Sequence, residues 1–329
     1  MFNRLSRTLF IGLSCLLSLS SFSNANSAKP QLSQQDILAM VEELSNWGRW
    51  GADDQLGAIN LITPKKRRQA AKLVKKGISV SLARDAETEP AADNPNPFVH
   101  TMLSDGQNLH AQWCSDNYSV SYHGFAHSHI DSLSHYVHKQ TLYNGISSKV
   151  VTSEGATKLD IHNLKNGIFS RGILIDLPKL RGVNYLEPGT AVYPEDLDAW
   201  EKLTGISVSS GDVVLLYTGR WARRDAVGPW NGTQAGLHAT SARWLKARDI
   251  AVLGSDGGSE VAPSGIPGVT SPIHLLMLHA MGVHMLDNLD LEALSKTARD
   301  LNRWDFLLTV APLPVNGGTG SPLNPIATF

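Results

Sequence analysis

The sequence has 329 residues but only two cysteines, and neither sign of charge is in excess. Two cysteines are too few for a disulfide framework, which excludes a small domain held together by disulfides. Lysine and arginine number 29 and acidic residues 30, so the formal net charge is -1. A chain without excess positive charge has no long-range attraction to nucleic acid or to an anionic membrane. We therefore expect a small molecule, and not a nucleic acid, as its partner.

Long apolar runs are also missing, with one short exception at the amino terminus. Residues 9–19 are mostly apolar, but about 20 such residues are needed to cross a bilayer, so we expect no stable membrane span. Two arginines precede this run, and Ser23-Asn24-Ala25 follows it as a small-x-small motif. This order is typical of a cleaved export signal. We predict a signal peptide over residues 1–25, a mature chain that begins near Asn26, and a periplasmic or secreted protein.

The two cysteines fall on either side of this predicted cleavage. Cys15 lies within the signal, and lipid attachment there is the alternative, although Gly12-Leu13-Ser14 lacks the usual leading aliphatic residue. Cleavage would leave Cys114 alone, and we expect it to be buried as a small apolar side chain.

The remaining sequence alternates segments of helix and strand character, without repeats, heptads or low-complexity tracts. β-Branched residues predict strands at residues 78–82, 172–177, 212–217, 250–254 and 306–310. Capping residues and apolar spacing predict helices at residues 33–44, 64–76, 194–203, 239–248 and 272–281. Proline and glycine predict loops at residues 87–97 and 312–325. This succession is typical of one α/β domain over residues 26–329, with a sheet covered by helices.

Histidine is abundant, and it is concentrated in one segment. Seven of the 12 histidines lie between positions 100 and 138. If residues 122–131 form a strand, one face carries three imidazoles and a carboxylate, namely those of His123, His127, His129 and Asp131. Burying these groups side by side without partners would be costly, and a divalent cation removes that cost. The pattern predicts a metal site, with a solvated edge strand or a purely hydrogen-bonded cluster as the alternatives.

The triplet His129-Ile130-Asp131, followed by His135, resembles a motif of the putative cyclase family, which includes bacterial kynurenine formamidases and isatin hydrolases. The family motif reads H-x-G-T-H-x-D-x-x-x-H. The resemblance implies that His129 and Asp131 bind a metal and that His135 is the catalytic acid/base.

This chain departs from the motif at its first position. The histidine that begins the motif falls on Phe125, whose side chain cannot bind a metal. His123 and His127 lie on the predicted face, so we expect one of them to supply the third ligand. The spacing does not choose between them.

Further segments extend the resemblance over most of the mature chain, at residues 50–57, 60–64, 143–145, 211–219 and 282–289. The resemblance implies a second metal site formed by His274 and the acid at position 287. Asp287 stands where the family has glutamate. Its carboxylate reaches about 1.5 Å less far, which is large against a tolerance of about 0.2 Å in ligand distances. We therefore expect one or two divalent ions per chain, zinc or manganese.

Three other side chains have two interpretations each. His279 and His284 are ligand candidates by residue type, but a histidine among leucines is more often part of the core. Glu260 follows a predicted strand, where it either lines a site or is an ordinary loop carboxylate.

The resemblance implies a single-domain swivelling β/β/α fold, with a mixed sheet and covering helices, and a homo-oligomer. It also implies an arylformamidase-like hydrolase of a small amide, formamide, cyclic imide or lactone, in which water attacks and His135 moves the proton. Two alternatives stay open. One is a periplasmic metal- or solute-binding protein without turnover, and the other is a lyase or dehydratase that uses the same ligands.

Overall fold

The structure is a computed structural model that describes Met1, residues 31–107, His110 and residues 112–329. Leu32–Phe329 forms one compact unit, and Met1–Gln31 is a separate one. Apart from Met1, the expected signal peptide of residues 1–25 lies outside the described residues. Within the described ranges, every helix is too short or too polar to span a bilayer.

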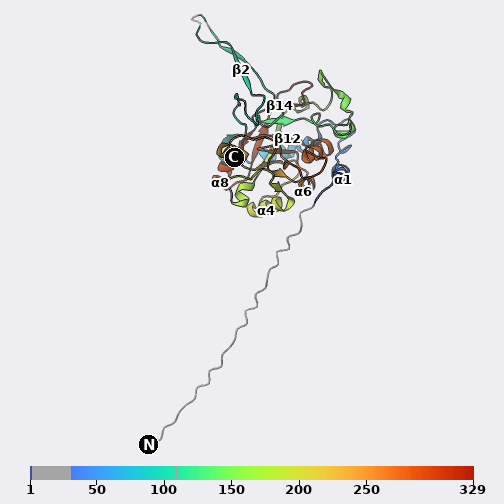
Figure 1. The fold of residues 1–329 in the computed structure, drawn as a ribbon, viewed down its shortest axis with the longest axis vertical. Coiled ribbons are helices and arrows are strands. Elements are labelled where there is room, and N and C mark those ends of the chain that lie inside the picture. Colours follow the sequence, from blue (N-terminus) through green and yellow to red (C-terminus); the bar gives the residue numbers. More distant parts are fainter. Residues whose placement is uncertain (2–30, 108–109, 111) are drawn as a thin grey trace. The chain divides into compact units, whose positions relative to one another are not determined.

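A mixed nine-stranded sheet lies at the centre of Leu32–Phe329 (Figure 1). Its strands, in spatial order, are β1 (Ser79–Ser81), β15 (Ile326–Thr328), β13 (Asp305–Val310), β7 (Ile168–Asp176), β9 (Val213–Tyr217), β11 (Val252–Ser255), β12 (His284–Asp287), β4 (His129–Asp131) and β14 (Gly320–Pro322). β7, β9, β11 and β12 run parallel. The other neighbouring pairs are antiparallel.

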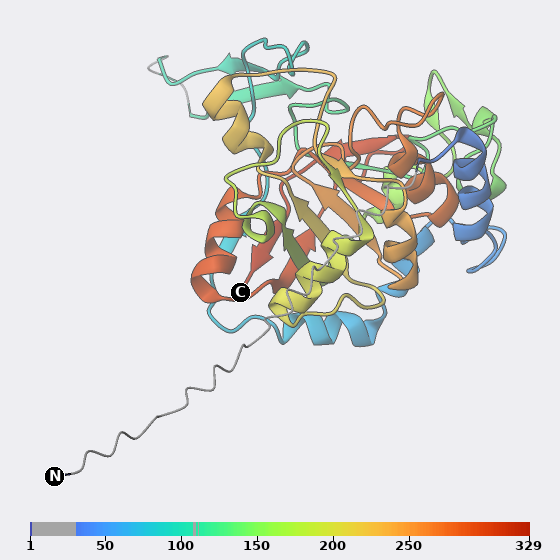
Figure 2. The ribbon, with the colours of Figure 1, turned by 60° about the horizontal axis from the view of Figure 1, so that its bottom comes forward.

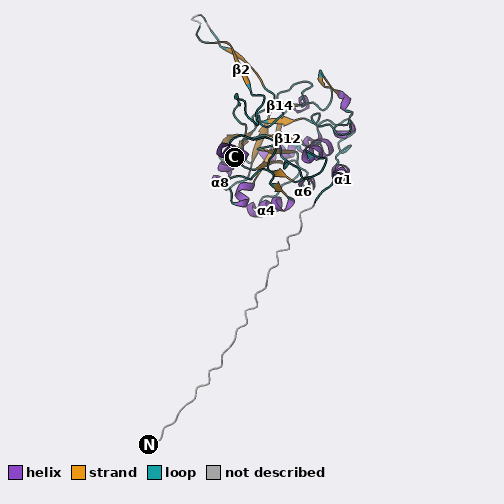
Figure 3. Ribbon diagram, in the orientation of Figure 1, coloured by secondary structure: helices purple, strands orange, loops and turns teal. Residues whose placement is uncertain are grey.

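Helices lie around this sheet, as Figures 2 and 3 show. The α-helices are α1 (Gln34–Leu44), α2 (Pro64–Ala71), α3 (Leu177–Arg181), α4 (Pro194–Thr204), α5 (Arg220–Val227), α6 (Ser241–Ala247), α7 (Pro272–His274) and α8 (Glu292–Leu301). The π-helix η5 (Leu275–Met281) continues α7, and the short 3-10 helices are η1 (Gly57–Leu61), η2 (Tyr143–Gly145), η3 (Ser148–Val150) and η4 (Ile161–Leu164). α2 packs against β7 and β13, α4 against β7, and η5 against β12. The expected mixed α/β fold with covering helices is confirmed.

Three pairs of short strands lie outside the main sheet. β8 (Ala191–Val192) pairs with β10 (Gly236–Leu237), and β5 (Val151–Thr152) with β6 (Gly155–Ala156). β2 (Val99–Ser104) and β3 (Ser115–Ser119) form a hairpin that extends away from the sheet in Figure 1. Cys114 precedes β3 in this hairpin and is exposed. The expectation that Cys114 is buried is therefore wrong, because the hairpin carries it away from the core.

The parallel strands form the core because their side chains are apolar on both faces. All residues of β9 and β11 are buried. Burying one such side chain, for example Leu215, stabilises the fold by about 1.5–3 kcal/mol relative to leaving it in water. The strands predicted from β-branched residues at 212–217 and 250–254 are both confirmed to within two residues.

Capping signals set where the first two helices begin. Ser33 and Asp36 form a capping box at the start of α1, as the sequence predicts. The side chain of Thr63 caps α2, with Pro64 as its first residue.

Tertiary contacts decide where the second of these helices ends. The segment predicted as a helix over residues 64–76 stops being helical at Ala71. The backbone N–H groups of Lys76 and Gly77 donate to the carbonyl oxygen of Phe329 instead. The end of the segment is therefore held at the sheet edge beside β15.

The loop predicted for residues 312–325 contains a strand of the main sheet. β14 pairs with β4 in antiparallel register, with Ser321 opposite Ile130. Its Gly-Ser-Pro sequence has low strand propensity, so the partner strand and not the local sequence selects this conformation.

A close backbone contact joins the segment before α2 to the start of β12. Gly57 has a φ of +56°, and the N–H of Ala58 donates to the carbonyl oxygen of Gly282 at 2.8 Å. A Cβ at position 57 would lie 2.1 Å from that oxygen, so glycine is required here. Because Gly282 leads into β12, this contact helps to fix the strand that carries Asp287.

Replacing Gly57 by alanine is expected to destabilise the protein more than replacing Gly77 by alanine. Both residues have positive φ, +56° and +68°, so both substitutions cost about 1–2 kcal/mol of backbone strain. A Cβ at position 77 meets no atom within 4 Å, whereas the collision at position 57 adds about 1–3 kcal/mol. Urea unfolding measures the difference, and equal midpoints for the two variants would contradict the contact.

Candidate metal centre

Strand pairing brings three of the predicted ligands to one face of the sheet. His129 and Asp131 are two residues apart on β4 and share a face, while Ile130 between them is fully buried on the other. The neighbouring strand β12 is antiparallel to β4, and its register sets Asp287 opposite His129. A carboxylate distant in the sequence thereby reaches the His129-x-Asp131 pair.

A first cluster consists of His123, His129 and Asp131, whose potential ligand atoms lie within 4.8 Å of one another. His123 Nδ1 lies 3.0 Å from Asp131 Oδ1, and His129 Nε2 lies 3.4 Å from the same oxygen. Two imidazoles from different segments thus face one carboxylate oxygen.

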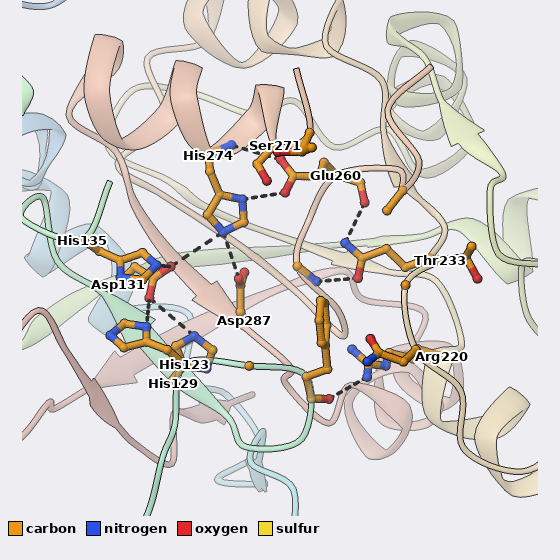
Figure 4. A pocket seen from close by; sticks show the side chains of 18 of the residues that line it. His123, His129, Asp131, His135, Arg220, Thr233, Glu260, Ser271, His274 and Asp287 are labelled. Atoms are coloured by element: carbon orange, nitrogen blue, oxygen red, sulfur yellow. Dashed lines mark hydrogen bonds and ion pairs between the residues drawn. The ribbon is translucent and has the colours of Figure 1, made fainter. Parts of the chain in front are cut away.

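A second cluster uses the other oxygen of the same carboxylate. His274 Nε2 lies 3.7 Å from Asp131 Oδ2 and 3.3 Å from Asp287 Oδ2. The ligand atoms of Asp131, His274 and Asp287 also fall within 4.8 Å of one another. Figure 4 shows the two clusters meeting at Asp131.

The buried polar atoms of the first cluster fit a divalent cation. Both oxygens of Asp131 and Nδ1 of His123 are buried and make no hydrogen bond. The 3.0 Å approach of His123 to Asp131 therefore lacks the alignment of a hydrogen bond. Buried polar groups without hydrogen bonds are costly unless something else compensates them. Imidazole nitrogens and carboxylate oxygens together are a donor set that zinc and manganese accept.

Each imidazole of the two clusters is fixed through its second ring nitrogen. His129 Nδ1 donates to the carbonyl oxygen of His127 at 2.8 Å. His274 Nδ1 lies 2.8 Å from Glu260 Oε1, and His123 Nε2 lies 3.1 Å from Thr319 Oγ1. Such contacts orient a metal-binding histidine and set its tautomer. Glu260 therefore lines the site, which settles its two interpretations.

The charges of the site are strongly coupled. Burial by itself would raise the pKa of Asp131, but the imidazoles of His123 and His129 hold it well below its usual range. Burial by itself would lower the pKa of His274, but the carboxylates of Glu260 and Asp287 raise it well above 6.5. These partners therefore favour the ionised form of Asp131 and the protonated form of His274.

His135 lies at the edge of the same group. Its Nε2 is 3.9 Å from Asp131 Oδ2, and its ring stacks on that of His123 with the centroids 4.0 Å apart. Burial, helped by the neighbouring imidazoles, lowers the pKa of His135 to about 4. The side chain is therefore neutral at pH 7 and has a lone pair that can accept a proton.

His127 does not join either cluster. The predicted strand is confined to residues 129–131, and residues 123–128 form an irregular loop, so alternation of side chains does not apply to them. The imidazole of His127 lies against the ring of Phe98, with the centroids 6.4 Å apart. The prediction that His123 and His127 share a face with His129 thus fails for His127, because the strand starts too late.

The other two ambiguous histidines belong to neither cluster. His279 and His284 are both buried, and burial lowers their pKa values to about 4 and about 3. Both are neutral at pH 7, as expected of core histidines.

A pocket of about 370 Å³ opens over the two clusters. Six of the seven predicted site residues line it, namely His123, His129, Asp131, His135, His274 and Asp287. Its remaining wall contains the aromatic rings of Phe125, Tyr136 and Trp230 together with Arg220 and Gln234.

Sequence analysis missed Arg220 and Trp230. Arg220 begins α5 shortly after the carboxyl end of β9, and the carboxyl ends of parallel strands commonly supply site residues. Its position after a predicted strand could therefore have identified Arg220 as a site residue. The local sequence around Trp230 contains no feature that predicts its place in the pocket.

Comparison with known proteins identifies the family. The sequence model of the family described as "Putative cyclase" matches residues 78–260. This chain belongs to the putative cyclase family. No curated protein matches it.

Solved structures of similar proteins share the fold of this cyclase-family chain. A novel cyclase is 28% identical, with a TM-score of 0.78 over 87% of this chain and 99% of its own. Isatin hydrolase A from Ralstonia solanacearum is 21% identical, with a TM-score of 0.54 over 76% of this chain and 91% of its own. Isatin hydrolase A from Labrenzia aggregata, bound to benzyl benzoate, is 21% identical, with a TM-score of 0.57 over 78% of this chain and 94% of its own.

Replacing His123 by alanine is expected to weaken metal binding by at least about 10-fold, because one donor of the first cluster is lost. Replacing His127 by alanine is the matched control, since this imidazole lies outside the pocket and the carbonyl that fixes His129 remains. Elemental analysis after equilibration with zinc or manganese measures the metal content. Metal loss in the His127 variant with retention in the His123 variant would contradict the cluster.

Cation binding by this cyclase-family protein is expected to strengthen between about pH 6 and pH 8, because a ligand proton must be released. His274 has a raised pKa, so its Nε2 carries a proton at the lower pH. Calorimetric titration with zinc, in two buffers with different ionisation enthalpies, measures the protons released. Affinity that does not change with pH would mean that His274 takes no part in binding.

Proposed function

We propose that this protein is a metal-dependent hydrolase of a small amide, formamide, cyclic imide or lactone. The observation that carries this proposal is the pair of His/carboxylate clusters that share Asp131 beside the neutral imidazole of His135. All of these groups line one pocket, where a substrate would contact them.

We propose His123, His129 and Asp131 as the ligands of one divalent cation, and Asp131, His274 and Asp287 as those of a second. Zinc and manganese are the proposed metals, one or two per chain. A cation held by such ligands polarises a carbonyl oxygen and makes water more acidic, so that no protein nucleophile is needed.

His135 is the proposed acid/base of the reaction. Its ring is neutral at pH 7 and lines the pocket beside Asp131, so it is in the protonation state that accepts a proton from attacking water. The same nitrogen then returns this proton to the leaving nitrogen or oxygen. Stacking on His123 holds the ring in place during both transfers.

The remaining wall of the pocket supports a substrate with a planar ring. Phe125, Tyr136 and Trp230 offer ring faces and edges, and aromatic groups pack favourably against one another. The pocket volume of about 370 Å³ suits a small molecule. We therefore place aryl amides and fused cyclic imides first among candidate substrates.

Three features of the protein remain proposals from the sequence alone. We propose a signal peptide over residues 1–25, which would direct export to the periplasm or outside the cell, and a hydrolase domain over residues 26–329. A homo-oligomer is the third proposal.

A metal- or solute-binding protein without turnover is less well supported. That alternative was motivated by Phe125 in place of a ligand and by the shorter Asp287. In the structure, His123 lies beside Asp131, and Asp287 lies 3.3 Å from His274. Each cluster therefore keeps three potential metal ligands despite the two departures from the family motif.

Replacing His135 by glutamine is expected to reduce the hydrolysis rate by about 10²–10⁴-fold while the metal content is retained, because proton transfer is lost but no ligand is removed. His138→Gln is the control, since His138 lies three residues further along the chain and packs against His279 outside the pocket. A panel of formanilides, cyclic imides and lactones, analysed by product mass, measures turnover. Full activity in the His135 variant would refute the proposed role, and a product without added water would favour a lyase.

A further inference from the structure

The loop that carries His123 has no regular secondary structure. Residues 123–128 form neither helix nor strand, whereas His129 and Asp131 are held by the ladder of β4. On one side, Tyr122 donates to the carbonyl of Gly320, and His123 contacts Thr319. These two contacts tie the start of the loop to β14. A different set of contacts is needed to hold the rest of it.

Asn288 supplies contacts on the other side of the loop. It follows Asp287 directly, is fully buried, and has a φ of +55°, a conformation that asparagine tolerates better than most residues. Its Nδ2 donates to the carbonyl oxygen of Gly124 at 2.7 Å. Its backbone carbonyl accepts from Ser128 Oγ at 2.7 Å. Asn288 thus contacts the loop near both of its ends.

Arg220 completes the same arrangement. Its Nη1 donates to Asn288 Oδ1 at 2.8 Å, and its Nη2 donates to the carbonyl oxygen of Phe125 at 2.6 Å. One planar guanidinium therefore bridges Asn288 and the loop, which the single amine of a lysine cannot do.

Arg220 is itself held by neighbours from three segments of the chain. Its side chain is only 6% exposed, with Asp93 at 3.8 Å and the ring of Trp221 beneath the guanidinium at 4.6 Å. Its backbone N–H donates to the buried carboxylate of Asp256. Burying this charge would be costly if the side chain served no purpose beyond packing.

We propose that Asn288 and Arg220 are positioning residues, which clamp the loop of residues 123–128 to the end of β12 and so hold His123 beside Asp131. This inference rests on the proposed function, because it assumes that His123 is a ligand. The clamp also couples the two clusters, since Asn288 adjoins Asp287 of the second and holds the loop of the first.

Asn288→Asp is the decisive variant. It keeps the size of the side chain and its tolerance of positive φ, but it sets an oxygen against the carbonyl of Gly124. A carboxylate added beside Asp287 would by charge alone strengthen cation binding. The clamp predicts the opposite effect on affinity, because loss of the contact with Gly124 would displace His123. We expect Co²⁺ to bind about 10–100-fold more weakly.

Asn144→Asp is the matched control. Asn144 also has positive φ, +61°. Its Nδ2 donates to the carbonyl oxygens of Gly51 and Ala52, and its Oδ1 accepts from the N–H of Gly48. It therefore clamps a loop in the same way but does not line the pocket. Its replacement is expected to lower thermal stability and to leave the Co²⁺ absorption spectrum unchanged.

Titration with Co²⁺, followed by visible absorption and by competition with a chelator, is the test. Asn288→Asp should give the spectrum of His123→Ala, and Arg220→Lys should shift it in the same direction. Wild-type affinity and spectrum in a folded Asn288→Asp variant would overturn the proposal. If Asn288→Asp does not fold, wild-type affinity and spectrum in Arg220→Lys would overturn the proposal instead. Failure of the unsubstituted protein to bind Co²⁺ would instead refute the proposed function, and the clamp with it.

Discussion

The site depends on the carboxylate of Asp131, which is ionised although only 1% of the residue is exposed. Neither of its oxygens receives a hydrogen bond, so the stabilisation of its charge comes from imidazoles. A buried charge without such partners would destabilise the fold by several kcal/mol. Four imidazoles from different segments lie 3.0–3.9 Å from this carboxylate, namely those of His123, His129, His135 and His274. Their shared contact with Asp131 explains why they converge there.

The direction of the strands decides which other residues reach this carboxylate. β9, β11 and β12 are parallel, and their carboxyl ends lead to Arg220, Glu260 and Asp287. Site residues of open α/β sheets commonly follow the carboxyl ends of their strands. β4 runs antiparallel to β12, and its register sets His129 opposite Asp287. A shift of this register by one residue would turn one of the two to the other face.

The residues around the ligands restrict what the ligands can do. Glu260 and Asp287 raise the pKa of His274, whereas burial lowers that of His135, so two imidazoles near one carboxylate differ in how tightly they hold a proton. The left-handed conformation of Asn288 and the buried charge of Arg220 carry a cost. The continuous apolar core of β9 and β11 offsets such costs elsewhere in the fold.

The sequence by itself determined the α/β class, the buried strands, the starts of α1 and α2, and the placement of His129 and Asp131 on one face, because each depends on local propensity or on alternation within a strand. It left His123 and His127 equivalent, since alternation holds only where a strand exists, and the loop before β4 follows its partners instead. Only the tertiary structure places His123, and not His127, beside Asp131. It also brought Asp287 and Arg220 to the pocket, because strand register and strand-end position arise from pairings between distant segments that no local pattern records.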